Sequence, residues 1–147
     1  MIAVIQRVTK ASVTIEDRVM SEIGNGYVIL LEIFEDDTEK DIEKIVDKII
    51  HLRVMADQNN KMNLSIEDVK GEILLVPQFT LCADTSQRRP SFIRAMEPKK
   101  AEALFNHVAG ELKKYNIPVK TGKFGAYMNV EIQNDGPVTI IIDTKKL

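Results

Sequence analysis

The chain has 147 residues, of which 44% are hydrophobic and 29% charged, and its formal net charge is −2 at pH 7. This length suits one domain with a proper core, so we expect a single domain over residues 1–147. The only cysteine, Cys82, excludes a disulfide framework and a zinc site built from several thiolates. With no signal-peptide pattern and no apolar run of about 18 residues, we expect a cytoplasmic protein that crosses no membrane.

Strands dominate the predicted start of the chain. Residues 2–9 and 11–16 either alternate between apolar and polar side chains or are continuously apolar, which indicates two strands of a hairpin. Residues 24–26 (Gly-Asn-Gly) are typical of a turn. Residues 27–34 are then almost entirely apolar, as expected of a strand that is covered on both faces.

Two amphipathic helices are predicted from residues at helical spacing. Thr38 and Asp41 resemble a weak capping box before the first helix, and Pro98 suits the first turn of the second. Each helix has one apolar stripe that should be buried. The first stripe is Ile42, Ile45, Val46, Ile49 and Ile50, and the second is Ala101, Leu104, Phe105, Val108, Leu112 and Tyr115.

The remaining segments complete an α+β pattern. A polar turn is predicted at residues 57–61, and a strand at 72–83 that Pro77 should force to an edge or a bulge, because proline cannot donate to the ladder. Three strand-like pieces follow the second helix: residues 118–121, 127–133 and 138–143. The order predicts a mostly antiparallel sheet or barrel with two helices packed on it.

Familiar catalytic patterns are absent. The sequence contains no Walker loop, no dinucleotide fingerprint and no Gly-x-Ser-x-Gly elbow. His51 and His107 fall late in the predicted helices, where surface positions are expected, and Cys82 is interpreted as a small core residue. We therefore expect no metal, no cofactor and no classical side-chain base.

Two short segments stand out. Residues 77–81 (Pro-Gln-Phe-Thr-Leu) are either an ordinary strand or a site where Gln78 and Thr80 present polar groups on one face of a sheet edge. Residues 134–139 (Asn-Asp-Gly-Pro-Val-Thr) are either a hairpin turn, which Asp-Gly favours, or a rigid pair of backbone acceptors. The second alternative requires a cis Gly136–Pro137 bond, with both carbonyls turned the same way.

Together these segments resemble motifs of the D-aminoacyl-tRNA deacylase family. Residues 77–81 match four of the five positions of its Ser-Gln-Phe-Thr-Leu motif, and residues 134–139 match every specified position of its Asn-x-Gly-Pro-x-Thr motif. Other similar stretches follow in the same order along essentially the whole chain: residues 4–8, 11–13, 89–92, 121–125 and Met128.

This resemblance implies a homodimer whose active site lies at the dimer interface. It places Gln78, Phe79 and Thr80 in the catalytic pocket. It also implies that Gly136 and Pro137 of the partner subunit, joined by a cis bond, insert there and screen the amino acid. The remaining implied substrate contacts are Arg7, which holds the Gly-Pro loop, and Phe124, Gly125 and Met128, which lie near the terminal adenosine.

The implied reaction is hydrolysis of the ester in D-aminoacyl-tRNA, and in glycyl-tRNA mischarged on tRNA-Ala, releasing free tRNA and the amino acid. An L side chain would collide with the Gly-Pro carbonyls and be rejected. The enzyme would orient the ester and offer backbone N–H groups, helped by the ribose 2′-hydroxyl of the substrate. The implied partner is tRNA, with neither DNA nor a membrane involved.

Several positions depart from the family pattern. Pro77 replaces the usual Ser, as in an animal-type branch that tolerates some L-alanine, whereas Phe79 points to the main branch. Glu32 stands where the family often has Gly, and residues 85–88 are unlike the usual Lys-Gly-rich version.

Three other interpretations stay open. The chain could be an ester hydrolase with Thr80 as nucleophile on another acyl substrate, a dimeric RNA-binding module, or a structural dimer without an RNA role. The net charge of −2 is unfavourable for phosphate contacts and supports the last. A local basic face is nevertheless expected from the Lys and Arg residues of segment 86–123, opposite in charge to the acidic segment 36–47.

Overall fold

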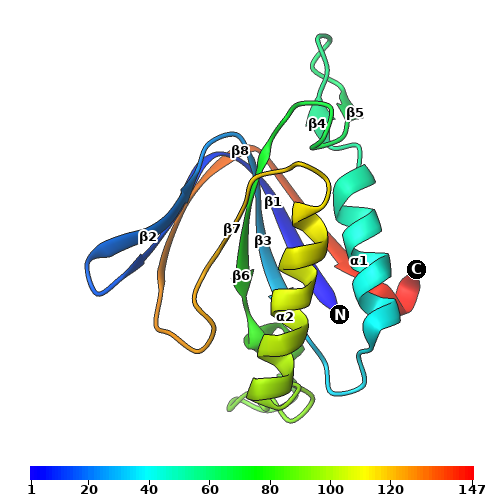
Figure 1. Cartoon of the computed structure of the whole chain (residues 1–147). Coiled ribbons are helices and arrows are strands. Elements are labelled where there is room, and N and C mark those ends of the chain that lie inside the picture. The colour runs from blue at the N-terminus through cyan, green and yellow to red at the C-terminus, as the bar shows by residue number, and fades with distance from the viewer.

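The computed structural model describes residues 1–147, and its main element is a mixed six-stranded sheet that curves into a nearly closed barrel (Figure 1). The helices α1 (Glu39–His51) and α2 (Pro98–Lys113) cover one face of this sheet. The α+β prediction with two packed helices is confirmed. The strands of the sheet are β1 (Ile2–Ile15), β2 (Arg18–Ile23), β3 (Gly26–Glu32), β6 (Glu72–Pro77), β7 (Val119–Thr121) and β8 (Asn129–Asp143).

The long strand β1 explains the curvature. Its first half pairs with β3 and its second half with β2, while β8 runs antiparallel along its other edge. One strand therefore belongs to two parts of the sheet and bends it around a second, smaller core. The prediction of a hairpin between residues 2–9 and 11–16 is wrong, because those residues form one strand whose hairpin partner is β2.

Parallel pairing is the part of the sheet that the residue pattern did not predict. β3 pairs parallel with β6, and β6 pairs parallel with β7. The buried apolar run predicted near residues 27–34 is confirmed as β3, since strands in parallel arrangements are covered on both faces. A separate two-stranded sheet of β4 (Met55–Ala56) and β5 (Met62–Leu64) flanks the predicted polar turn at 57–61.

Two further strand predictions need correction. The strand predicted at 72–83 ends at Pro77, and residues Phe79–Cys82 form a 3-10 helix, η1. β6 lies between β3 and β7, but its pairing with β7 covers only Ile73–Leu75. Pro77 is therefore paired on the β3 side alone, which agrees with an edge at this residue. The pieces predicted at 127–133 and 138–143 are one strand, β8, and residues 134–137 are no hairpin turn.

Both predicted helices are present, with their apolar stripes facing the sheet. All five residues of the first stripe are buried, as are Ala101, Phe105, Val108 and Leu112 of the second. The Asp41 side chain accepts a hydrogen bond from the Thr38 N–H at 3.0 Å, as the capping box predicts. A short 3-10 helix, η2 (Thr144–Lys146), ends the chain. Neither α-helix is long and apolar enough to cross a membrane.

Glu97 caps the second helix, and its removal gives a first testable expectation. Its carboxylate accepts hydrogen bonds from the N–H groups of Lys99 and Lys100, both at 3.1 Å. Because these donors have no partner within the helix, we expect Glu97→Ala to lower the free energy of unfolding by about 1 kcal/mol, measured by urea denaturation. Glu102→Ala, on the exposed face of the same helix, is the control. Equal loss in both variants would contradict the capping role.

Candidate functional site

A pocket of about 670 Å³, here called the main pocket, opens where the parallel strands β3 and β6 end. Fourteen of its 20 lining residues are hydrophobic. Leu31 and Val76 come from the strand ends, Pro98 and Phe105 from α2, and the opposite wall from the segment that follows β7. The ends of two parallel strands meet at one edge of a sheet, so segments distant in sequence gather there.

Two of the three predicted catalytic residues line this pocket. After Pro77 the chain leaves the strand, and the Gln78 N–H donates to the Leu31 carbonyl at 2.9 Å. Gln78 and Phe79 line the main pocket, whereas Thr80 accepts a hydrogen bond from the Gln78 amide and is not part of the lining. The expectation that Gln78 and Thr80 share one strand face is wrong, because Thr80 lies in η1.

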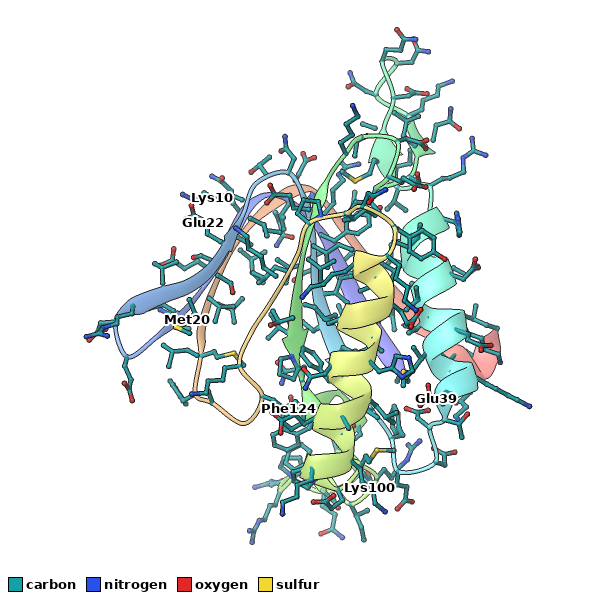
Figure 2. The ribbon with its side chains drawn as sticks, in the orientation of Figure 1. Lys10, Met20, Glu22, Glu39, Lys100 and Phe124 are labelled. Atoms are coloured by element: carbon teal, nitrogen blue, oxygen red, sulfur yellow. The ribbon has the colours of Figure 1, made fainter.

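Aromatic rings surround the mouth of the pocket. The Phe79 side chain is 57% exposed and meets the Phe92 ring edge-on, with centroids 5.2 Å apart. Opposite, the Phe124 ring packs against Phe105 at 6.0 Å. Figure 2 shows Phe124 beside the N-terminal part of α2, the end that carries Lys100. The pocket therefore offers flat apolar walls.

The residues predicted near a terminal adenosine also lie at this pocket. Phe124, Gly125 and Met128 line it together. Gly125 has a φ of +73°, which L side chains rarely adopt, so a glycine suits this turn between β7 and β8.

Arg7, Gly136 and Pro137 form a second group. Gln6 pairs with Thr139 and Val8 with Asn134, so residues 135–138 of β8 bulge opposite Arg7. The Gly136–Pro137 bond in this bulge is cis, and both residues are exposed.

The Arg7 side chain ties this bulge to a neighbouring loop. Its Nε donates to the Asp135 carbonyl at 3.2 Å and lies 3.0 Å from the Asp135 carboxylate. Its Nη1 donates to the Val54 carbonyl at 2.8 Å. The guanidinium thus holds the base of the bulge in place.

Within one chain this bulge does not reach the main pocket. Arg7 pairs with Tyr27 near the start of β3, whereas the pocket begins at Leu31 near its end. Four strand residues at about 3.3 Å each put the two places roughly 13 Å apart. Neither Arg7, Gly136 nor Pro137 is among the lining residues.

Glu32 is a pocket residue to which the motifs assigned no role. It directly follows Leu31, the residue that pairs with Pro77 at the end of the β3–β6 ladder, and it lines the main pocket and is only 1% exposed. The pKa of its carboxyl is raised to about 8. Burial is the largest cause, a hydrogen bond with Cys82 opposes it, and the neighbouring Asp37 adds to the rise. Oε1 has no hydrogen-bond partner. The only sign in the sequence that Glu32 belongs to the site was that it stands where the family often has Gly.

The other candidate side chains lie away from the pocket. His107 contacts Glu39 at 2.9 Å and Glu111 at 3.3 Å on the surface of the helices, and His51 contacts Asp47. Neither histidine lines the main pocket, which agrees with the surface positions predicted for them. Cys82 is buried as expected, and burial raises the pKa of its thiol. No group of three or more His, Cys, Asp or Glu side chains is placed to hold a metal ion.

Comparison with known proteins identifies the family of this chain. The family model described as D-Tyr-tRNA(Tyr) deacylase matches residues 4–143. This chain belongs to that deacylase family. A D-aminoacyl-tRNA deacylase from Sulfurihydrogenibium sp. (strain YO3AOP1) is 53% identical over 148 residues, covering 100% of both chains. Membership identifies the chain as a deacylase, a hydrolytic enzyme, and agrees with the resemblance found in residues 77–81 and 134–139.

Solved structures agree with the deacylase fold. A chain titled c-Myc DNA Unwinding Element Binding Protein superposes with a TM-score of 0.92 and is 46% identical, covering 97% of this chain and 98% of that one. A probable eukaryotic D-amino acid tRNA deacylase superposes with a TM-score of 0.85 at 16% identity, covering 96% and 97%. The second comparison supports the fold alone.

Proposed function

We propose that this deacylase hydrolyses the ester of D-aminoacyl-tRNA in the main pocket, and that a homodimer completes the site. The observation that carries the proposal is the separation of the two motif segments. Gln78 and Phe79 line the pocket. Gly136 and Pro137 of the same chain lie in the bulge opposite Arg7, and the step along β3 from the level of Arg7 to the pocket is roughly 13 Å. A second copy can bring its own bulge to the pocket, so that both motifs act on one substrate.

Exposed apolar surface supports dimer formation. Large exposed hydrophobic side chains on β2, η1, β8 and the loop before β8 would be covered if these elements meet a second copy. These side chains are Val19, Met20, Phe79, Tyr127 and Ile141. Sedimentation of the purified protein should therefore give twice the mass of the chain, and a monomer at assay concentration would contradict the proposal.

In the proposed reaction, water attacks the ester carbonyl, and the bond between that carbon and the ribose oxygen breaks. The products are the free D-amino acid and tRNA with its 3′-hydroxyl restored. η1 begins at Phe79, and its first hydrogen bond is donated by Leu81 to Gln78, so we propose that the N–H groups of Phe79 and Thr80 face the developing oxyanion. The ribose 2′-hydroxyl assists, and the protein positions the ester.

The enzyme would distinguish D- from L-amino acids by steric exclusion of the L side chain. This discrimination supports a role in proofreading charged tRNA. The exposed backbone of Gly136 and Pro137 of the partner subunit would fill the space that an L side chain needs. A D-amino acid leaves this space free, and so does glycine, so glycyl-tRNA mischarged on tRNA-Ala would also be hydrolysed. Pro77 at the pocket rim is the position where rejection of L-alanine could be relaxed.

The deciding assay compares tRNA charged with D-tyrosine and tRNA charged with L-tyrosine, following release of the amino acid. We expect rapid release from the D form only. Release from both would retain deacylation and overturn the chiral screen. Binding of tRNA without release would favour the RNA-binding module. Neither binding nor release would favour a structural dimer.

The partner and location belong to the same proposal. We expect the protein to act on tRNA in the cytoplasm and to bind no duplex DNA, which a gel-shift experiment with labelled DNA would test. The exclusion of DNA stays a prediction.

Thr80 is expected to be dispensable for the chemistry. Its hydroxyl accepts a hydrogen bond from the Gln78 amide and lies outside the pocket lining, so it positions Gln78. We expect Thr80→Ala to keep D-tyrosine release within about tenfold of wild type, which corresponds to the loss of one hydrogen bond. Thr80→Ser is the matched control. Loss of all activity in the Ala variant, with retention in the Ser variant, would instead identify Thr80 as a nucleophile.

A further inference from the structure

Glu32 is the carboxyl in the main pocket with an oxygen that no group of the protein hydrogen-bonds. The other carboxyl there, Glu97, caps α2, and the Gln78 amide donates to Thr80. Glu32 is 1% exposed, and its Oε1 has no hydrogen-bond partner. Burying a polar oxygen without a partner is unfavourable, so a ligand that supplies the partner would bind favourably.

The surroundings of Glu32 favour a neutral carboxyl. Burial raises its pKa to about 8, so most of it holds a proton at pH 7. The cation that acts on Glu32, the N-terminal ammonium of Met1, is already paired with Asp37 at 2.6 Å. The other ionisable groups around it are Cys82 from η1, Arg94 near Cys82 in the loop that follows, and Glu97 from α2.

A carboxylic acid presents one donor and one acceptor side by side. Around Glu32 the pocket has aromatic walls formed by Phe79, Phe92, Phe105 and Phe124, which suit a flat ring system. The edge of an amino-substituted purine offers the matching pair, a ring nitrogen that accepts and an amino group that donates. A turn of the carboxyl toward the cavity would bring Oε1 to this edge.

We propose that Glu32 hydrogen-bonds the edge of the terminal adenine of the substrate and is a specificity-determining residue of this chain. The inference rests on the proposed function, because the base comes from the 3′ end of tRNA. The proposal assigns a role to the Glu32 side chain, which is absent where glycine occupies the same position. Affinity for an adenosine ligand then falls when Glu32 ionises, because a carboxylate cannot donate.

The test uses 3′-deoxy-3′-(D-alanylamino)adenosine, an amide that cannot be hydrolysed like the ester, and titration calorimetry at pH 6.5 and pH 9. Wild type should lose affinity about tenfold at pH 9, one pH unit above the titration of Glu32. Glu32→Gln keeps a donor and an acceptor without titrating. It should match wild type at pH 6.5 and show only the pH dependence of the ligand itself. Glu32→Gly should bind roughly tenfold more weakly at pH 6.5.

An analogue with unsubstituted purine, which lacks the amino donor, is the matched ligand. The advantage of wild type over Glu32→Gly should be smaller for this analogue, because only the hydrogen bond to the ring nitrogen remains. Weak binding of the adenosine ligand by Glu32→Gln as well as Glu32→Gly would show that a carboxylate is needed, for example to hold the substrate ammonium, and would overturn the proposal. Equal binding by all three proteins would also overturn it.

Failure of this inference can be told apart from failure of the proposed function. Wild-type release of D-tyrosine from tRNA tests the proposed function and does not depend on how Glu32 behaves. Thermal unfolding at pH 6.5 checks that each variant is folded. Should Glu32→Gly fail to fold, the comparison of wild type with Glu32→Gln still decides. A larger loss of affinity at pH 9 in wild type than in Glu32→Gln supports the proposal, and identical pH profiles overturn it.

Discussion

Gly136→Ala is expected to abolish release of D-tyrosine from tRNA while the protein still folds. Gly136 has a φ of +123°, a conformation that L side chains rarely adopt. An added Cβ would lie 2.9 Å from Val138 Cγ2, 3.1 Å from the Val138 amide nitrogen and 3.2 Å from Arg7 Nη2. Because the amide is backbone, the bulge must shift to accommodate the methyl group.

Such a shift would misplace the proposed screen in the pocket of the partner subunit. A displacement of about 1 Å can lower a rate about 100-fold, and we expect a loss of at least that size. The strain should lower the free energy of unfolding by about 1–3 kcal/mol, which leaves the chain folded. Amino acid release and urea denaturation measure the two effects separately.

Gly110→Ala is the matched control for this substitution. Gly110 lies in α2, is exposed, and has no heavy atom within 4 Å of the position of an added Cβ. Alanine should stabilise the helix by about 0.5–1 kcal/mol and leave the rate unchanged. Turnover by Gly136→Ala near the wild-type rate would contradict the proposed role of the bulge.

Glu32→Gln is expected to stabilise the protein at high pH. The folded-state pKa of about 8 lies above the ordinary value of 4.5, so between these pH values the folded chain holds a proton that the unfolded chain has lost. The free energy of unfolding of wild type should therefore fall as pH rises from about 4.5 to 8, by about 1.4 kcal/mol per pH unit at most. Glutamine does not titrate, so the free energy of unfolding of the Glu32→Gln variant does not fall for this reason.

Because a buried amide also needs partners, we expect a net gain on the order of 3 kcal/mol at pH 9 and little difference at pH 5. Urea denaturation of both proteins at the two pH values measures this gain, and the contributions of other titrating groups cancel in the comparison. Glu67→Gln removes one carboxylate from an exposed position and serves as the control. A stability difference that is the same at pH 5 and pH 9 would show that Glu32 is ionised in the folded protein.

The expectations that held depend on local patterns. Isoleucine and valine at helical spacing predicted α1 and its buried face, because a 3.6-residue period places them on one side of a helix. Pro98 marked the start of α2, where a missing N–H costs nothing. Residues 77–81 and 134–139 were singled out by their chemistry and by their resemblance to family motifs.

The expectations that failed concern strand pairing. Residues 2–16 alternate in a way that fits either a hairpin or one long strand, and only pairing with β2, β3 and β8 decides between them. Asp-Gly favours a turn, yet in residues 134–139 it fits equally well into a bulge opposite Arg7. The alternation of side chains reports which faces are buried and carries no information about the partner strand.

By itself, then, the sequence determined the single domain, the two helices with their buried stripes, and the segments that carry the family resemblance, because each depends on neighbouring residues. Only the tertiary structure decided that Gln78 and Phe79 share a pocket with Phe124 and Met128, and that the Gly136–Pro137 bulge lies apart from that pocket. It also decided that Glu32 is buried with a free oxygen. These features arise where distant strands end together, and no local pattern specifies which strands will meet.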